Sequence, residues 1–288
     1  MLIHDFNYLK PHSLEEAFAL MEQYDHDLKF LAGGTDLLVQ MGHKNIKPAN
    51  VMDIKALDLS YCRMEKGLLQ IGAATTLSEL LLKPMIRQNF IPLWEAVKVM
   101  ASVQVRNRAT IGGNLCNGAP SADCAPPLSI LKAQLVISSK NKKRIIPLDE
   151  FFVGPGQTIL ERGELLMEIH IPEIPQYSAG AYCKHMRSVQ DISLVGVGAW
   201  IKMDQDGRCS DIRVCLGAVG PTILRAIRSE QFMLGKEVNE QYIKEAADLA
   251  IKDAKPRDDI RASVVYRNRI VKVLAAKALR TAWLRAIQ

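Results

Sequence analysis

The amino-acid sequence predicts an α+β fold, arranged as one large domain or two unequal ones. The chain has 288 residues, which exceeds the usual size of a single domain. Apolar residues make up 48% of it and charged residues 24%, values that are ordinary for a folded globular protein. Runs with strand-like alternation lie among segments with helical periodicity in both halves of the chain. A sizeable core with mixed secondary structure is therefore expected.

The first expected elements are a helix and a buried strand. The stretch SLEEAFALMEQY begins with Ser13 and Glu16 in capping-box spacing, and its apolar residues recur at helical intervals. Residues 28–34, LKFLAGG, predict a short buried strand that ends in a glycine loop, and DLLVQM predicts a brief helical turn after it. Further strands are expected in NVMDI and in the pair YCRME and LLQIGA, which form a hairpin across Lys66 and Gly67.

Two more helices precede a long polar segment. Thr76 and Glu79 repeat the capping-box spacing before LSELLL, which stops at Pro84, and IPLWEAVKVMAS has a helical period. Residues 103–128 are rich in Gly, Pro, Asn and Ser but carry few charges after Arg108, a profile typical of an ordered functional loop. Strand-like alternation returns in AQLVISS, RIIPLDEFF and ELLMEIHIP.

The segment 172–180 is the best candidate boundary, so we expect an N-terminal domain over residues 1–175 and a C-terminal domain over residues 178–288. In the second part, QDGR separates two strand-like runs, with Asp206 and Gly207 at the turn of a hairpin. Two helices follow, in NEQYIKEAADLAIKDA and in the amphipathic run 263–287. The C-terminal part is thus predicted to be an α+β module.

Composition argues against several classes of function. The formal net charge is +6, but Lys and Arg are scattered without the aromatic interleaving of a single-strand binding groove, so no nucleic-acid partner is expected. No signal peptide or membrane-length apolar run is seen, so we expect no membrane association and a cytoplasmic location. The six cysteines include no CxxC pair, so reduced thiols and no metal site are expected.

Two glycine pairs carry the functional signal. LAGGTDLLVQ and ATIGGNLCNG each place two glycines after apolar residues and a small polar residue directly behind them. Clustered backbone N–H groups bind anions, and glycine admits phosphate oxygens because it has no Cβ. Thr35 and Asn114 can each add a side-chain donor, whereas Asp36 can only accept, from a hydroxyl or an amide. One such pair alone favours a tight turn, but the repeat favours a shared pyrophosphate. Neither a GxGxxG fingerprint nor a Walker loop is present.

KFLAGGTDLL together with VQVRNRATIGGNLCNGAPSAD resembles the FAD-binding subunit of the molybdenum hydroxylases, a family that includes xanthine, carbon monoxide and nicotinate dehydrogenases. The similarity covers nearly the whole chain and includes the F.Y.K opening, the GPGQTIL...ELL segment and RAS..YR at residues 261–267. Among members, NGAPSAD and RAS..YR are most similar to bacterial xanthine dehydrogenase FAD-binding subunits. The resemblance implies a FAD-binding domain of the vanillyl-alcohol-oxidase (PCMH) type with two α+β subdomains, followed by a C-terminal α+β domain of the CO-dehydrogenase-flavoprotein type.

The resemblance also assigns predicted FAD contacts. The first side of the pyrophosphate would be wrapped by Lys29, Phe30, Leu31, Ala32, Gly33, Gly34, Thr35, Asp36 and Leu37, and the second by Thr110, Ile111, Gly112, Gly113 and Asn114. Single positions that match FAD contacts in relatives are Ala101, Asp123, Leu166 and Lys184, with Asp123 on the ribityl or adenosine portion and Lys184 near the flavin ring. Alternatives stay open for three of them: a turn cap for Asp123, a solvent-facing strand residue for Lys184, and simple core packing for Leu166.

The cofactors implied by the resemblance are divided among subunits. This chain would bind FAD non-covalently, because no histidine lies beside either glycine pair and Cys116 and Cys124 are expected to be free thiols. A large subunit would hold the molybdenum cofactor and a small subunit two 2Fe-2S clusters. FAD would pass the electrons to NAD+, so no acid or base catalyst and no metal ligand is expected in this chain.

Three alternatives remain. The chain could serve a related hydroxylase with nicotinate, carbon monoxide or an aromatic-CoA as substrate. It could be a stand-alone flavin reductase such as the enolpyruvyl-glucosamine reductases, although RAS..YR argues against that. A non-enzymatic nucleotide-phosphate scaffold is the third alternative.

The glycine pairs generate a first prediction. We expect Gly33→Val and Gly113→Val to abolish FAD binding, because a Cβ and its methyls would occupy the space of phosphate oxygens. The absorbance of bound flavin and a FAD titration measure this. Normal FAD affinity in both variants would refute it.

Overall fold

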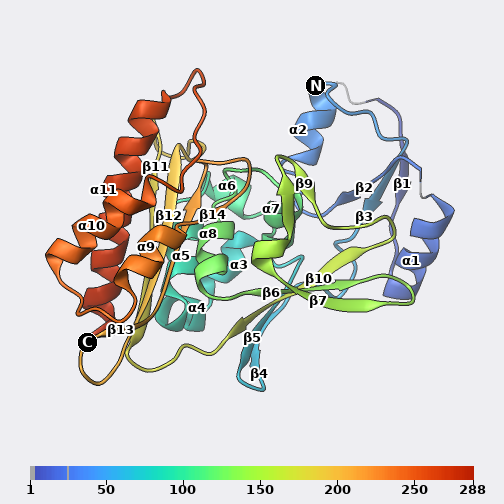
Figure 1. Cartoon of the computed structure of the whole chain (residues 1–288). Helices are drawn as coiled ribbons and strands as arrows, with labels where there is room; N and C mark the ends of the chain where they lie inside the picture. The colour runs from blue at the N-terminus through green and yellow to red at the C-terminus, as the bar shows by residue number, and fades with distance from the viewer. Residues whose placement is uncertain (1–3, 25) are drawn as a thin grey trace.

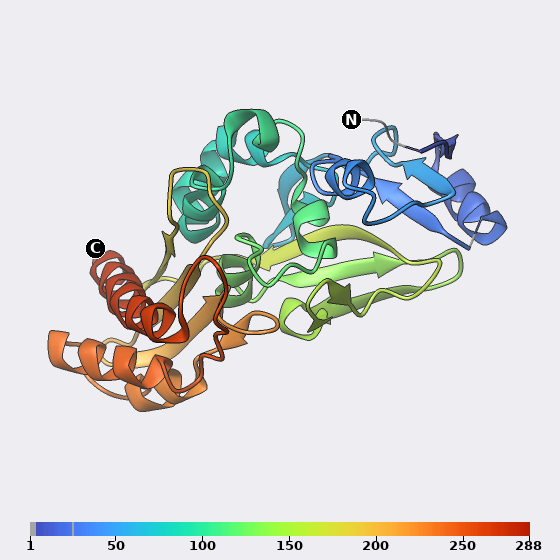
Figure 2. The same ribbon diagram turned by 90° about the horizontal axis from the view of Figure 1, so that it is seen from above.

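A computed structural model describes residues 4–24 and 26–288 of the chain. Helices and strands are mixed along its whole length, and the predicted α+β class is confirmed. A small sheet from the N-terminal segment lies at one end of the molecule and the C-terminal helices lie at the other, with a larger sheet between them (Figures 1 and 2).

The small sheet is parallel, with β3 (Asn50–Asp53) between β1 (Asn7–Leu9) and β2 (Leu28–Leu31). The predicted first helix is α1 (Leu14–Gln23), and Ser13 Oγ accepts from Glu16 N at 3.1 Å. The predicted helical turn after β2 is α2 (Leu37–Gly42). Helix α1 buries Ala17, Phe18 and Met21 in the same core as Met52 of β3.

The larger sheet is antiparallel and joins segments from both sides of residues 103–128. Its strands, in spatial order, are β4 (Cys62–Glu65), β5 (Leu68–Gly72), β10 (Leu165–Pro172), β6 (Gln134–Ser138) and β7 (Lys143–Pro147). The predicted β4–β5 hairpin is confirmed, because Lys66 and Gly67 both have positive φ and form its turn. The strand predicted over RIIPLDEFF ends early at Pro147, where a 3-10 turn (Leu148–Glu150) begins before the short pair β8 (Phe152–Gly154) and β9 (Gln157–Thr158).

Helices cover this sheet between β5 and β6. They are α3 (Leu77–Leu82), α4 (Pro84–Asn89), α5 (Ile91–Lys98), α6 (Val103–Arg106), α7 (Ile111–Cys116) and α8 (Ala125–Ile130). The capping box predicted at Thr76 and Glu79 is formed at the start of α3. The segment 103–128, expected to be an ordered functional loop, contains the short helices α6 and α7 and the start of α8. Side-chain caps from Ser102 and Thr110 start the first two of these helices.

The C-terminal part is a four-stranded antiparallel sheet with helices on one face. Its strands are β11 (Ser178–His185), β12 (Val195–Met203), β13 (Cys209–Gly217) and β14 (Leu224–Arg225), and its helices are α9 (Ile227–Met233), α10 (Glu240–Ala250) and α11 (Val264–Ala286). The hairpin predicted around Gly207 is confirmed as β12–β13. Helices α10 and α11 bury their apolar residues against the sheet in one core.

The other face of the C-terminal sheet packs on α5 and α8 of the preceding part. Close approach requires glycine in the sheet, since a Cβ on Gly217 would lie 2.8 Å from Pro126 Cγ. Arg285 of α11 pairs with Glu95 of α5 at 2.6 Å, so ionic contacts also cross this boundary. No helix within residues 4–24 and 26–288 is long and apolar enough to cross a bilayer.

Candidate functional site

A cavity of about 880 Å³ lies where the parts of the chain meet. One wall comes from the end of β2 and the start of α2, and a second comes from residues 100–123. The C-terminal part closes the cavity with Lys184 and residues 190–192. This volume falls in the range of sites for small molecules and cofactors.

All but two of the predicted FAD contacts line this cavity. Leu31 and Ile111 do not line it, and Ile111 is fully buried in the core. The residues that line it are Lys29, Phe30, Ala32, Gly33, Gly34, Thr35, Asp36, Leu37, Ala101, Thr110, Gly112, Gly113, Asn114, Asp123, Leu166 and Lys184. The structure therefore gathers residues from distant parts of the sequence around one space. Their contact with FAD stays a prediction.

The first glycine pair presents free backbone donors. It lies between β2 and α2, and Gly34 adopts a φ of 78°, which glycine tolerates without strain. Within the described part of the chain, no group accepts a hydrogen bond from the N–H of Gly33, Gly34, Thr35 or Asp36. A run of unpaired N–H groups in a turn next to a helix N-terminus is a site for an anion.

The second glycine pair is built differently. It lies in the first turn of α7, where Thr110 is the N-cap and its Oγ1 accepts from Gly113 N at 3.0 Å. Ile111 N donates to Thr75 O at 3.0 Å, Gly112 N to Ala73 O at 2.9 Å and Asn114 N to Thr110 O at 3.0 Å. All four amides are thus used inside the protein. Of the two glycine pairs expected to grip one pyrophosphate, the second therefore has no free backbone amide to offer, and its contact with a pyrophosphate stays a prediction.

Gly33 and Gly112 are needed for close packing against backbone carbonyls. A Cβ on Gly33 would lie 2.1 Å from the carbonyl oxygen of Arg108, and one on Gly112 would lie 2.5 Å from that of Ala73. Backbone atoms cannot move aside as flexible side-chain ends can, so these positions exclude any larger residue. A Cβ on Gly113 meets only Thr110 Oγ1, at 2.9 Å. The steric reason for the glycines is therefore contact with protein backbone in addition to approach of a ligand.

Asp123 lines the cavity, and its carboxylate is bound by three side chains of the C-terminal part. Its carboxylate accepts from Tyr182 OH at 2.8 Å, from Lys184 Nζ at 2.8 Å and from Ser193 Oγ at 2.7 Å. The Lys184 side chain is 2% exposed and that of Asp123 is 7% exposed, so both alternatives, a solvent-facing lysine and a simple turn cap, are wrong. Burial and the charge of Asp123 raise the pKa of Tyr182 well above its usual value, so its hydroxyl stays a donor. Sequence reasoning did not find Tyr182 or Ser193, and no local motif marks them.

Three further residues, in or next to the cavity wall, differ in their contacts. Arg106 donates to the carbonyls of Met100 and Ala101 at 2.6 and 2.8 Å, and so supports the left-handed backbone of Ala101, whose φ is 45°. Asn114 Oδ1 accepts from Cys124 N at 3.3 Å and its Nδ2 donates to Met100 Sδ at 3.9 Å, so one N–H of the side-chain amide is left as the donor predicted from the sequence. Leu166 is 2% exposed, in agreement with core packing of its side chain.

Desolvation raises the pKa of two residues that line the cavity, Asp36 and Cys116. Crowding by neighbours raises the pKa of Asp36, and no residue within 4–24 and 26–288 donates a hydrogen bond to its carboxylate. Desolvation also raises the pKa of Cys116 to about 12, so this cavity-lining thiol is protonated at neutral pH. All six cysteines are free, and the described residues contain no group of three or more His, Cys, Asp or Glu side chains that could hold a metal ion.

Comparison with known families matches both parts of the chain. The FAD binding domain in molybdopterin dehydrogenase matches residues 4–174. The CO dehydrogenase flavoprotein C-terminal domain matches residues 180–282.

Relatives match from end to end. The carbon monoxide dehydrogenase medium chain of Hydrogenophaga pseudoflava is 36% identical over 97% of this chain and 98% of that protein. The xanthine dehydrogenase FAD-binding subunit of Escherichia coli O157:H7 is 35% identical over 95% of this chain and 94% of that protein. Among solved structures, carbon monoxide dehydrogenase from Hydrogenophaga pseudoflava superposes with a TM-score of 0.95 at 35% identity over 99% of both chains. Quinoline 2-oxidoreductase from Pseudomonas putida 86 does so with 0.93 at 28% identity over 100% of both chains.

The packing of Gly33 generates a sharper prediction than the valine substitutions. We expect Gly33→Ala to destabilise the chain without FAD by about 1–3 kcal/mol, because the added Cβ collides with the Arg108 carbonyl. The affinity of the chain for FAD should fall together with its stability. Gly113→Ala is the matched control and should cost less, since its Cβ meets one side-chain oxygen. Thermal unfolding and FAD titration compare the two, and equal losses would contradict this packing argument.

The ion pair of Glu164 and Arg144 predicts a pH dependence. Arg144 donates to both carboxylate oxygens of Glu164, at 2.6 and 2.8 Å, and lowers the pKa of that carboxyl. The stabilisation of the folded state by this ion pair is therefore present above the pKa that Glu164 has in the unfolded state. It is lost as pH falls through the lower pKa that Glu164 has in the folded state. We expect Glu164→Gln to cost about 1–3 kcal/mol at neutral pH and progressively less below about pH 4.

Urea unfolding at a series of pH values measures this difference. Glu150→Gln is the control, because the Glu150 side chain is exposed and takes part in no ion pair within residues 4–24 and 26–288. A loss that stays constant down to acidic pH would rule out the ionic contribution.

Proposed function

Because this chain belongs to the family of FAD-binding domains in molybdopterin dehydrogenases, we propose that it is the electron-transfer flavin subunit of a molybdenum hydroxylase. The proposal assigns FAD binding to residues 1–175 and the C-terminal module to residues 178–288. It assigns no substrate chemistry to this chain.

The observation that carries the proposal is the run of free amides at residues 33–36, all of which line the cavity of about 880 Å³. A pyrophosphate needs several donors that approach closely and carry no competing internal partners. Four consecutive N–H groups meet this need, and Thr35 adds a hydroxyl beside them. The site therefore fits the diphosphate of FAD by its donor set.

Other residues would bind the remainder of FAD. The carboxylate of Asp36 accepts no hydrogen bond from the residues that the structure describes, which suits a sugar or ribityl hydroxyl as its donor. Thr110–Asn114 would form the second wall through surface contact and the Asn114 amide, since their backbone amides are used elsewhere. Lys184, held by Asp123 at 2.8 Å, places a buried cation at the opposite wall. The protonated thiol of Cys116 favours non-covalent binding.

FAD, when bound, supplies both one-electron and two-electron transfer. The chain's own residues bind it, exclude water and set its surroundings. We assign no residue as acid or base catalyst.

The proposed partners follow from the relatives. A molybdenum-binding large subunit would oxidise the substrate, and a small subunit with two 2Fe-2S clusters would relay electrons to FAD. We propose xanthine as the substrate and NAD+ as the acceptor, in purine metabolism in the cytoplasm. The similarity to carbon monoxide dehydrogenase chains is equally strong, so related hydroxylase substrates, including nicotinate and aromatic-CoA compounds, are the alternative.

The proposal predicts partner dependence. We expect the isolated chain to bind FAD and turn yellow but to oxidise no xanthine, because it contains no group that can hydroxylate a substrate. Co-expression with the two partner subunits should restore turnover, and a screen of xanthine, nicotinate and carbon monoxide with NAD+, oxygen and a quinone identifies substrate and acceptor.

Three outcomes would overturn it. Substrate turnover by the isolated chain would refute partner dependence. Reduction of an enolpyruvyl sugar with NADPH would favour a stand-alone flavin reductase. A colourless chain that takes up no added FAD would favour a nucleotide-phosphate scaffold.

A further inference from the structure

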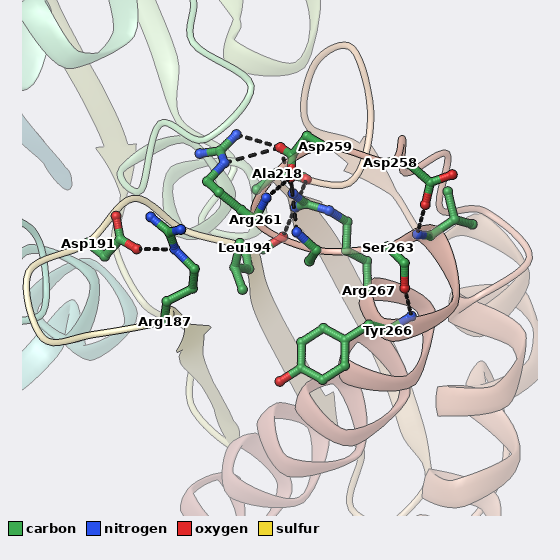
Figure 3. Close-up of polar contacts among 12 residues, drawn as sticks. Arg187, Asp191, Leu194, Ala218, Asp258, Asp259, Arg261, Ser263, Tyr266 and Arg267 are labelled. Atoms are coloured by element: carbon green, nitrogen blue, oxygen red, sulfur yellow. Dashed lines mark hydrogen bonds and ion pairs between the residues drawn. The ribbon is translucent and has the colours of Figure 1, made fainter.

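Arg267, in the RAS..YR motif, is a buried cation that the proposed function leaves unused. It lies on the first turn of α11, and the whole residue is 3% exposed. Its Nη1 donates to the carbonyl of Leu194 at 2.6 Å and to that of Ala218 at 3.3 Å. Leu194 directly precedes β12 and Ala218 directly follows β13, so one guanidinium holds the adjoining ends of two neighbouring strands (Figure 3).

The turn before α11 fixes this guanidinium in place. Arg267 Nη2 donates to both carboxylate oxygens of Asp259 at 2.9 Å, and Arg261 Nη2 donates to the same carboxylate at 2.8 Å (Figure 3). The amides of Arg261 and Ala262 also donate to Asp259, at 2.8 and 3.1 Å. Burial would raise the pKa of Asp259, but these hydrogen bonds outweigh it and lower the pKa, so the carboxylate stays charged.

The carbonyl of Leu194, which Arg267 holds, lies directly after the loop 186–193. This loop borders the cavity. Gln190, Asp191 and Ile192 of this loop line the cavity, and Ser193 Oγ donates to Asp123. The loop is closed at its base by Leu194 N, which donates to His185 O at 2.9 Å. It contains a strained residue, because Gln190 has a φ of 75°. Such a loop keeps one conformation only if its ends are held.

The second carbonyl that Arg267 holds belongs to Ala218, a residue that also contacts the N-terminal wall of the cavity. Ala218 has a left-handed φ of 64°, and its N–H donates to Pro120 O at 2.8 Å. Ala119 and Ser121, on either side of Pro120, line the cavity. Arg267 is therefore one hydrogen bond away from the chain segment that carries the loop 190–192, and two hydrogen bonds away from the 119–121 segment, although its own side chain does not line the cavity.

We propose that Arg267 is a positioning residue that holds the loop 186–193 and the 119–121 segment against the cavity, and so limits the exposure of bound FAD to solvent. The assignment of FAD as ligand rests on the proposed function, whereas the effect on the loop does not. Arginine suits the task because its planar fork donates to the carboxylate and to both carbonyls at once. A lysine ammonium can reach only part of this set.

The test compares Arg267→Met, Arg267→Lys and Asp259→Asn with Arg269→Met. Arg269 is two positions away on α11 and exposed, so it is a matched control for loss of one cation from this helix. Hydrogen exchange of the full chain without FAD reports on the loop, and the control for folding is exchange at residues 270–286 of α11. Iodide quenching of flavin fluorescence, after FAD is added, reports on exposure of the flavin.

In Arg267→Met we expect amide exchange across residues 186–194 to accelerate by at least about tenfold, because charge-assisted hydrogen bonds that close the loop are lost. Residues 270–286 should keep their protection. Iodide quenching should increase, Arg267→Lys should recover part of the effect, and Asp259→Asn should shift both readouts in the same direction as Arg267→Met. Arg269→Met should match the wild type.

Unchanged exchange at residues 186–194 in a folded Arg267→Met chain would overturn the inference. If Arg267→Met does not fold, unchanged exchange and quenching in Asp259→Asn and Arg267→Lys would overturn it as well. Failure of the wild-type chain to bind FAD would overturn the proposed function instead, and the exchange data would still decide the role of Arg267 in the loop.

Discussion

The cavity depends on one buried carboxylate, Asp123, which accepts three hydrogen bonds from the other part of the chain. Tyr182 and Lys184 come from β11 and Ser193 from the loop that follows it. A buried carboxylate is costly unless it is paired, so these donors must be in place for the folded state to be stable. The same pairing fixes β11 and its loop against the segment before α8. The wall of the candidate site and the contact between the two parts of the chain thus share one interaction.

The two glycine pairs, alike in sequence, differ in what they offer a ligand. Gly33 and Gly34 follow a strand end in a turn whose amides find no acceptor among the described residues. Gly112 and Gly113 begin a helix whose first amides bond to Thr75, Ala73 and Thr110. The second pair still matters for the first, because the Arg108 carbonyl just ahead of it packs directly on Gly33. One segment provides donors and the other holds it in position. Both pairs need glycine because Gly33 and Gly112 each pack directly against a backbone carbonyl.

Much of the secondary structure could be predicted, because the signals are local. Helix α1 and helix α3 begin at the caps expected from Ser13 and Thr76, and both hairpins turn where Lys66–Gly67 and Gly207 permit positive φ. The helices that start within residues 103–128 were missed because they are short and this segment is rich in Gly, Pro and Asn, residues that are typical of loops. The partners of Asp123 were missed for another reason: they lie 59 to 70 positions along the chain.

The sequence by itself determined the α+β class and the family, and it predicted many of the residues that line the cavity, because caps, turns and the two glycine motifs consist of adjacent residues. Only the tertiary structure decided which amides remain free, which lysine is buried against Asp123 and how Arg267 reaches two strand ends. These features depend on backbone groups whose partners come from remote segments. A hydrogen bond already made within the fold cannot be offered to a ligand, and the order of residues along the chain does not reveal which bonds are made.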